Sequence, residues 1–372
     1  MDINPSIFRE YDIRGIVGKD LDEDIVRTLG RAIGTYFLGR GKREVAMGRD
    51  CRLSSPSFAE ALAAGLLSTG CNVTDLGIIP TPVLYFCIFY KKLEAGVMIT
   101  GSHNPPEHNG FKMMAGEETL SGSDIQAIWG IIAEGKYAGG AGVRKSYDLV
   151  PEYRDYILRD VKLARRLKVV VDAGNGTGGV VAVPLFRTLG CDVVDLYCDM
   201  DGRFPNHHAD PTLPEAMKDL TDKVLETGAD LGIGYDGDAD RIGVVDDKGK
   251  IIWGDQLMVV FARDLLPTHP GAAVISEVKA SKVLYDEIAR LGGKPVMWKA
   301  GHSLIKKKIR EEKALIAGEM SGHIFFVDRW FGFDDAIYSS ARLLEILAKT
   351  DRKLSEILSD LPRTFTTPEI RV

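Results

Sequence analysis

The sequence predicts an α/β protein of three consecutive domains, with mixed, mostly parallel sheets around a central cleft. Runs rich in Val and Ile alternate with stretches of helical period, a pattern typical of parallel strands joined by helices. At 372 residues the chain is too long for one hydrophobic core. In each third of the chain, an apolar run leads into a short polar loop that contains glycine.

The first third, residues 1–147, contains two amphipathic helices that can cover a sheet. One spans about 22–38, and its apolar stripe consists of Ile25, Leu29, Ile33 and Phe37. The other has Ser55 as a candidate cap and Pro56 in its first turn, and it ends at Gly70.

The domain boundaries follow changes in composition. Residues 135–147 are rich in Gly and charge without an apolar period, which predicts a linker before a second domain at 148–250. A third domain is expected at 251–362, ending near Leu361 and Pro362. Within these two domains, buried strands are predicted at 168–172, 229–236, 272–276 and 314–318.

Composition excludes several classes of protein. The net charge of −6 and a pI near 5.7 argue against a nucleic-acid or anionic-membrane partner, which requires a basic field. No apolar run approaches the roughly 18 residues of a membrane span, and the N-terminus lacks a signal-peptide pattern. The five cysteines are scattered and odd in number, so we expect a reduced, cytoplasmic protein.

An acidic loop follows the strand predicted at 229–236. Asp236, Asp238 and Asp240 occupy alternate positions and can direct oxygen ligands at one hard cation such as Mg²⁺. An EF-hand is excluded because its sixth position requires Gly where this chain has Arg241. A solvated acidic turn is the alternative, but three carboxylates followed by an arginine after a buried strand favour a metal site.

Ser102 is a candidate nucleophile, because it lies in the polar loop Thr100–Pro105 directly after an apolar strand. The adjacent His103 does not make a hydrolase pair, since neighbouring side chains rarely face each other. A nearby Mg²⁺ would neutralise the oxygens of a phosphoryl group on Ser102 and make it a better donor. The serine loop and the aspartate loop are therefore consistent with a shared role in phosphoryl transfer.

The third polar loop offers Glu319, Ser321 and His323, which suit the vicinal hydroxyls of a sugar and equally suit a helix-capping turn. Isolated cations occur near glycines or strand ends in this acidic chain: Arg9, Arg14, Lys112, Lys279 and His302. Because the carboxyl ends of strands face one edge of an α/β sheet, the three loops can converge on one cleft.

Two other motifs have simpler interpretations. The segment 174–179 loosely matches a dinucleotide fingerprint, but its last spacing is wrong and a tight strand-to-helix turn is favoured. His207 and His208 with Asp210 could ligate a metal, yet adjacent histidines project differently, and a polar interdomain loop is favoured.

The loops TGSHNPP, DGDADR and GEMSGH, in this order, resemble those of the α-D-phosphohexomutases over essentially the whole chain. The residues of the first and third loops resemble those of the bacterial phosphomannomutase/phosphoglucomutase branch. Phosphoglucosamine mutases usually have Gln in place of Met320. The resemblance implies an isomerase of carbohydrate metabolism that interconverts mannose or glucose 1-phosphate and 6-phosphate.

The resemblance also implies roles for single residues. Ser102 would carry the phosphoryl group and, with Asp236, Asp238 and Asp240, complete the Mg²⁺ site. Lys112 and His323 would transfer protons, with Arg14 giving electrostatic help. Substrate contacts would come from Tyr11, Arg241, Lys279, Gly301, His302, Glu319, Ser321 and His323.

In the implied reaction a 1,6-bisphosphate intermediate turns around in the cleft. Glucose 1,6-bisphosphate, or its mannose counterpart, would prime the dephosphorylated enzyme. The enzyme would be a monomer or weak dimer, and its partners would be small hexose phosphates. The family also has a fourth, C-terminal domain that binds the phosphate not being transferred. Residues 363–372 match only its start, so we expect weak activity from this chain.

Three alternatives stay open at the level of sequence. A phosphoglucosamine mutase would prefer an amino sugar over mannose 1-phosphate. A sugar-phosphate binding protein would keep the site but lack turnover. A third idea, a phosphatase that forms an aspartyl phosphate, predicts a label on Asp238 instead of Ser102.

Overall fold

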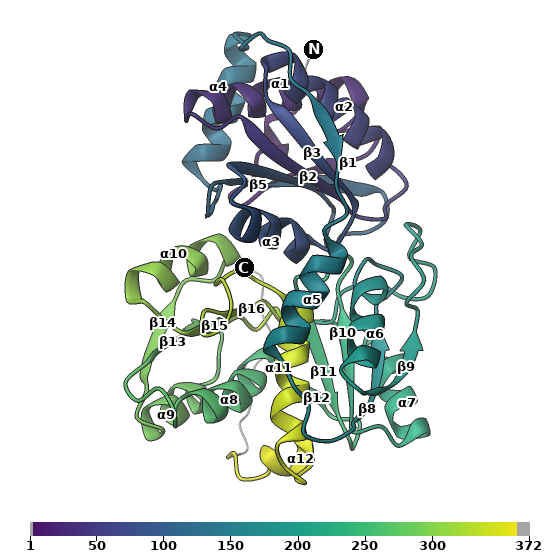
Figure 1. Cartoon of the computed structure of the whole chain (residues 1–372), viewed down its shortest axis with the longest axis vertical. Coiled ribbons are helices and arrows are strands. Elements are labelled where there is room, and N and C mark those ends of the chain that lie inside the picture. Colours follow the sequence, from purple (N-terminus) through teal and green to yellow (C-terminus); the bar gives the residue numbers. More distant parts are fainter. Residues whose placement is uncertain (1–2, 363–372) are drawn as a thin grey trace.

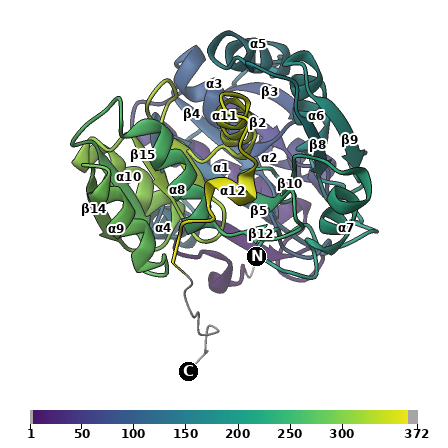
Figure 2. The same cartoon turned by 90° about the horizontal axis from the view of Figure 1, so that it is seen from below.

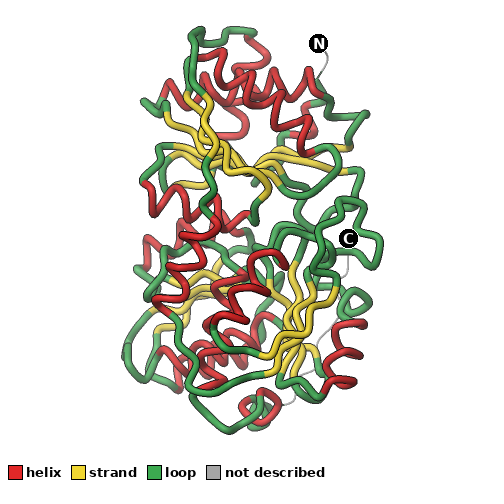
Figure 3. Tube along the Cα trace, turned by 45° about the vertical axis from the view of Figure 1, so that its right-hand side comes forward, coloured by secondary structure: helices red, strands yellow, loops and turns green. Residues whose placement is uncertain are grey.

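The computed structural model describes residues 3–362. It contains three α/β units, with the first above the second and third, which lie side by side (Figure 1). The expected start of a fourth domain at 363–372 lies outside the described residues. Each unit has its own sheet, and the sheets are separate blocks of strands in the chain trace (Figure 3).

The first sheet has the order β1-β5-β4-β2-β3-β7, with β6 paired to β5. Its three parallel pairs are β4–β2, β2–β3 and β3–β7, and its other pairs are antiparallel. The strands are β1 (Ile13–Ile16), β2 (Glu44–Arg49), β3 (Asn72–Ile78), β4 (Ala95–Ile99), β5 (His108–Ala115), β6 (Glu118–Thr119) and β7 (Arg144–Ser146).

Helices cover both faces of this sheet. Val45 and Met47 of β2 pack with the helices above it, while Ala46 faces the opposite core, as the alternation of strand side chains requires. The helices above are α1 (Glu23–Gly39), α2 (Ser55–Thr69) and α4 (Ser123–Glu134), and the helix below is α3 (Thr81–Lys91). The short η1 (Pro5–Ile7) precedes β1.

Local signals set the helix ends. The Asp22 side chain accepts a hydrogen bond from Ile25 N at the start of α1, and Gly70 ends α2 with φ of 101°. Ser55 lies inside α2 and bonds Asp50 instead of acting as the cap. The expected linker at 135–147 is wrong in its last part, because residues 144–146 form β7 beside β3.

The second sheet has the order β12-β11-β10-β8-β9. β8 pairs in parallel with β10 and β9, whereas β11 is antiparallel to β10 and β12. Its strands are β8 (Lys168–Asp172), β9 (Asp192–Leu196), β10 (Leu231–Tyr235), β11 (Ile242–Asp246) and β12 (Ile251–Ile252). The helices of this part are α5 (Val150–Asp160), α6 (Gly179–Thr188) and α7 (Lys218–Thr227).

The third sheet has the order β14-β13-β15-β16, in which only β15–β16 is antiparallel among the described strands. Its strands are β13 (Ala273–Glu277), β14 (Lys294–Trp298), β15 (Ile316–Gly318) and β16 (Ile324–Phe326). Its helices are α8 (Gly254–Leu265), α9 (Lys282–Arg290) and α10 (His302–Glu312).

Helix α11 (Ala336–Ala348) joins the second and third units, and the view from below shows it at the centre of the molecule, near α12 (Leu354–Ile357) (Figure 2). Every residue of α11 is buried, because it contacts α6 and β11 on one side and α8 and β16 on the other. A helix without a solvated face requires neighbours all around. No helix within residues 3–362 is long and apolar enough to cross a bilayer.

Candidate active site

The three polar loops meet where the three sheets converge. The Ser102 hydroxyl, after β4, donates a hydrogen bond of 2.8 Å to Asp236 Oδ2, after β10. Arg241, at the end of the same aspartate loop, forms a β-bridge with His323 of the third loop. Residues from all three domains therefore share one site, as the strand-end argument predicts.

Ser102 is held in an uncommon backbone conformation. Its φ is 51°, in the left-handed region, and its amide donates to Thr100 Oγ1 over 2.8 Å. The residue is 2% exposed, so its hydroxyl faces the other loops and not bulk solvent. Strain at such a position is compensated by surrounding contacts and is often found at functional sites.

Arg52 supplies those contacts, and sequence analysis did not identify it. Its buried guanidinium donates to the carbonyls of Ser102, Asn104, Pro105 and His108 at 2.5 to 3.0 Å. Asp50 accepts from Arg52 Nε at 3.1 Å and from the Gly101 amide at 3.1 Å. Only contacts across the fold reveal this role, because the local sequence around Arg52 carries no motif.

The three aspartates are completely buried under Ser102. Burial and the neighbouring carboxylates Asp238 and Asp240 raise the pKa of Asp236. Lys112, on β5, donates to Asp238 Oδ2 at 2.7 Å and also contacts Asp240. Although burial lowers the pKa of Lys112, the aspartates outweigh this and raise it above its usual value, so Lys112 is charged.

The aspartate loop fits a divalent cation. Carboxylate oxygens of Asp236, Asp238 and Asp240 lie within 4.8 Å of one another. Asp238 Oδ1 is buried and has no hydrogen-bond partner within residues 3–362, and Asp240 Oδ1 has only an ion-pair contact of 3.3 Å with His323 Nε2. Buried carboxylate oxygens without a partner are costly, and an oxygen-preferring ion would satisfy them.

The turn at 174–179 connects β8 to α6, as the sequence predicts, and it packs against the aspartate loop. Thr177 N donates to Gly237 O at 3.0 Å. A Cβ added to Gly176 would lie 2.6 Å from the same carbonyl oxygen, so only glycine fits there. The close approach at Gly176 therefore lets this turn pack against the aspartate loop, a contact that the sequence alone did not reveal.

The third loop forms a hydrogen-bonded group around His323. Its Nδ1 lies 3.0 Å from Glu319 Oε2 and 3.1 Å from Ser321 Oγ, and its Nε2 lies 3.3 Å from Asp240 Oδ1. Burial lowers the pKa of His323, but Asp240 and Glu319 outweigh it and raise the pKa to about 9. Glu319 also accepts from Gly301 N at 2.6 Å.

These residues border a cavity of about 290 Å³. It is lined by Arg9, Glu10, Tyr11, Asp12, Arg14, Ser102, His103, Lys112, Arg241, His302 and His323. Among the expected site residues, the aspartates, Glu319, Ser321 and Gly301 are not part of this lining, but they contact Ser102 or His323, directly or, for Gly301, through Glu319. Lys279, two residues after β13, is also not part of it.

The histidine pair of the second domain serves another purpose. His207 Nε2 lies 3.0 Å from Asp172 Oδ2 at the end of β8, and Asp210 Oδ1 lies 4.0 Å from Arg241 Nη1. His207 therefore pairs with one carboxylate, as a structural contact in a polar loop does. The arrangement agrees with the loop interpretation favoured by the sequence.

A buried serine hydroxyl bonded to one of three clustered carboxylates, where three α/β domains meet, is an arrangement that suits phosphoryl transfer and is typical of the phosphosugar mutase class. Models of phosphoglucomutase/phosphomannomutase α/β/α domains I, II and III match residues 5–139, 151–249 and 253–365. The chain belongs to this family, the α-D-phosphohexomutases.

Individual relatives agree with this assignment. A phosphomannomutase/phosphoglucomutase of Pseudomonas aeruginosa is 51% identical over 367 residues, which cover 99% of this chain and 79% of that protein. A phosphoglucomutase of Neisseria meningitidis is 46% identical, over 98% of this chain and 80% of that protein. The crystal structure of a family member from Burkholderia thailandensis superposes with a TM-score of 0.95, at 46% identity, covering 99% of this chain and 82% of that one.

Proposed function

We propose that this chain interconverts hexose 1-phosphate and hexose 6-phosphate, with mannose, glucose or both as the sugar, through a phosphoryl group on Ser102. The observation that carries the proposal is the 2.8 Å hydrogen bond between the Ser102 hydroxyl and Asp236, in a cleft shared by three domains. Relatives of about 50% identity named for mannose and glucose phosphates support this choice of substrate.

Asp236, Asp238 and Asp240, with an oxygen of phosphorylated Ser102, would hold Mg²⁺. When bound, the ion neutralises phosphoryl oxygens and so lowers the barrier to transfer. The chain supplies the rest: buried carboxylates set the charge, and the Arg52 contacts keep the Ser102 loop in one conformation. Lys112 keeps the aspartates compensated by a positive charge.

In the first transfer the Oγ–P bond of Ser102 breaks and a bond forms between phosphorus and a hexose hydroxyl oxygen, whose proton leaves to a base. In the second, the other phosphate returns to Ser102 and the freed hexose oxygen regains a proton. We assign proton transfer to His323 and Lys112, which line the cavity and both contact Asp240. In its protonated form either group can give a proton to the freed hexose oxygen, and only after losing that proton can it accept the proton of the attacking hydroxyl. Arg14, also in the lining, contributes positive charge.

The remaining cavity residues suit a phosphosugar. Tyr11, Arg241 and His302 offer a hydroxyl, a guanidinium and an imidazole to the sugar and its second phosphate. Glu319 and Ser321 position His323 and belong to the same recognition loop. Lys279 would also bind the substrate, and glucose or mannose 1,6-bisphosphate would activate the enzyme. The protein would be a monomer or weak dimer in the cytoplasm.

Peptide mass mapping after incubation with glucose 1,6-bisphosphate tests the proposal. We expect one phosphorylated residue, Ser102, and no label in Ser102→Ala. A label that persists in this variant, or one on Asp238, would assign the nucleophile elsewhere. Turnover is then compared for mannose 1-phosphate, glucose 1-phosphate and glucosamine 6-phosphate to identify the substrate. A preference for the amino sugar would contradict the proposed substrate class.

A further inference from the structure

A buried ion pair, Lys306–Asp334, lies next to His302, which lines the cleft. Lys306 Nζ donates to Asp334 Oδ1 over 2.8 Å, and the side chains are 5% and 0% exposed. The ammonium also lies 4.3 Å from the centre of the Tyr85 ring. An ion pair this deep loses solvation on both sides, so it is weak support for stability alone and calls for another explanation.

The second oxygen of Asp334 supplies that explanation. Asp334 Oδ2 lies 3.6 Å from His302 Nδ1, and neither atom has a hydrogen-bond partner within residues 3–362. His302 is the first residue of α10 and Lys306 follows one turn later, so both point to the same side of the helix. A small rotation of the imidazole would close the hydrogen bond.

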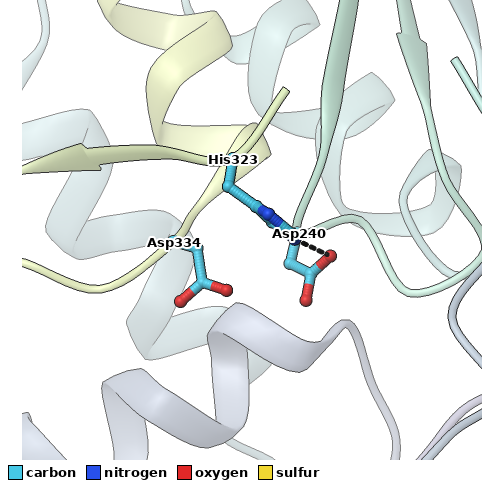
Figure 4. A group of neighbouring side chains, drawn as sticks. All are labelled: Asp240, His323 and Asp334. Atoms are coloured by element: carbon cyan, nitrogen blue, oxygen red, sulfur yellow. Dashed lines mark ion pairs between the residues drawn. The ribbon is translucent and has the colours of Figure 1, made fainter. Parts of the chain in front are cut away.

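The other charges around Asp334 are already matched. Figure 4 shows Asp334 next to Asp240 and His323, with His323 directed toward Asp240. Asp240 is compensated by Lys112 and His323, which leaves Lys306 as the cation nearest to Asp334. The Asp334 carboxylate accepts a hydrogen bond from the Lys306 ammonium at one oxygen, and its other oxygen remains as an acceptor. His302 is the neighbour with a nitrogen left to donate.

The imidazole of His302 is neutral, because burial keeps its pKa well below the usual value. A neutral imidazole donates from one nitrogen and accepts at the other. If Nδ1–H faces Asp334, Nε2 is an acceptor. Since His302 lines the cleft beside Tyr11, with ring centres 6.1 Å apart, that acceptor is available to a ligand.

We propose that Asp334, fixed by Lys306, is a positioning residue that selects the Nδ1–H tautomer of His302, so that Nε2 accepts a hydrogen bond from a substrate hydroxyl. The inference rests on the proposed function for the identity of the substrate. The pair acts through His302 and touches no reacting atom. It adds orientation to a binding residue, as carboxylates do for imidazoles at other functional sites.

The tautomer is measured directly by NMR of the protein labelled with ¹⁵N-histidine, with His302→Gln used to assign the signal. We expect the neutral Nδ1–H form in the parent protein and the Nε2–H form in Asp334→Asn. The reason is that the asparagine carbonyl accepts from Lys306 and its amide then donates to Nδ1. An Nε2–H form in the parent protein, or an unchanged tautomer in the variant, overturns the proposal.

Kinetics supply the second readout. Asp334→Asn should raise KM for glucose 1-phosphate about tenfold, the effect of one lost hydrogen bond, with a smaller change in kcat. If Asp334 acts through His302, combining Asp334→Asn with His302→Gln should give the same KM as His302→Gln alone. Effects that multiply in the double variant would contradict the mechanism.

Two further variants separate positioning from folding. Asp328→Asn is the matched control, because Asp328 Oδ2 also pairs with a buried cation, Arg342 Nη2, at 3.1 Å but does not line the cleft. We expect this control to leave KM and the tautomer unchanged. If Asp334→Asn unfolds because Lys306 is left without its partner, the double variant Lys306→Gln/Asp334→Asn removes both charges. This double variant should still switch the tautomer of His302.

The outcomes also distinguish this inference from the proposed function. A parent protein that turns over no hexose phosphate and labels no serine contradicts the proposed function, while the tautomer experiment still tests the role of Asp334. A parent protein that is active, with KM and tautomer insensitive to Asp334→Asn, contradicts only the inference.

Discussion

Ser102 and Asp236 are 134 residues apart in the chain and are joined by a hydrogen bond of 2.8 Å. This bond connects the loop after β4 in the first domain to the loop after β10 in the second. Neither domain alone holds both the Ser102 hydroxyl and the carboxylates. The chemistry therefore depends on how the domains pack.

Changing Asp240 to Asn should weaken Mg²⁺ binding by about 100-fold or more and lower kcat at fixed Mg²⁺, because a buried ligand charge is removed. Titration calorimetry measures the affinity independently of turnover. Chelator treatment of the parent protein should abolish activity, and added Mg²⁺ should restore it. Equal affinities in the two proteins would place the cation elsewhere.

Changing Arg52 to Met should lower the free energy of unfolding by about 3 to 5 kcal/mol, because Asp50 is left buried without its cation. The rate of Ser102 labelling by glucose 1,6-bisphosphate should fall as well, since four loop carbonyls lose their donor. Urea unfolding and mass mapping measure the two effects. Lys218→Met is the control. Lys218 forms an exposed ion pair with Asp222 on one helix, and its loss should not measurably change the free energy of unfolding.

Changing Gly176 to Ala should lower Mg²⁺ affinity about tenfold, because the new Cβ would displace Gly237 in the aspartate loop. The matched control is Gly130→Ala in α4, where no atom lies within 4 Å of the added Cβ. The control should stabilise the fold by about 0.5 to 1 kcal/mol through helix propensity. Calorimetry and thermal unfolding separate the two results, and unchanged Mg²⁺ affinity in Gly176→Ala would contradict the contact.

Changing His207 to Gln should remove a pH-dependent part of the stability. Burial lowers the pKa of His207, but the hydrogen bond and charge of Asp172 outweigh it, so the folded pKa is raised. Its stabilisation is therefore complete below the unfolded pKa near 6.5 and is lost as pH rises through the folded pKa. The difference in unfolding free energy between parent and variant should be larger at pH 6 than at pH 9.

Asp172→Asn checks the same contact from the other side. Urea unfolding of this variant should show the same reduced pH dependence, because the imidazole loses the charge that raises its pKa. A pH dependence equal to that of the parent protein would mean that another group titrates.

Much of the fold followed from sequence where the signal is local. The strand at 168–172 coincides with β8, and the helix expected at about 22–38 corresponds to α1, because apolar spacing and an aspartate cap are short-range features. β7 has no local strand signal, because Arg144–Ser146 is polar and becomes a strand only by pairing with β3. The sequence suggests Ser55 as a cap, because it does not show that Asp50 binds the Ser55 hydroxyl.

The residues of the candidate site also fall into those with a local sequence signal and those that only tertiary contacts identify. The sequence by itself determined the chemical inventory, because Ser102, the aspartate loop and the Glu319–His323 loop each stand at a strand end within a few residues. Only the tertiary structure decided what supports them, since Arg52, Gly176 and Asp334 act through partners distant in the chain. A side chain's type is fixed by sequence, but its partners and their desolvation exist only once the domains have packed.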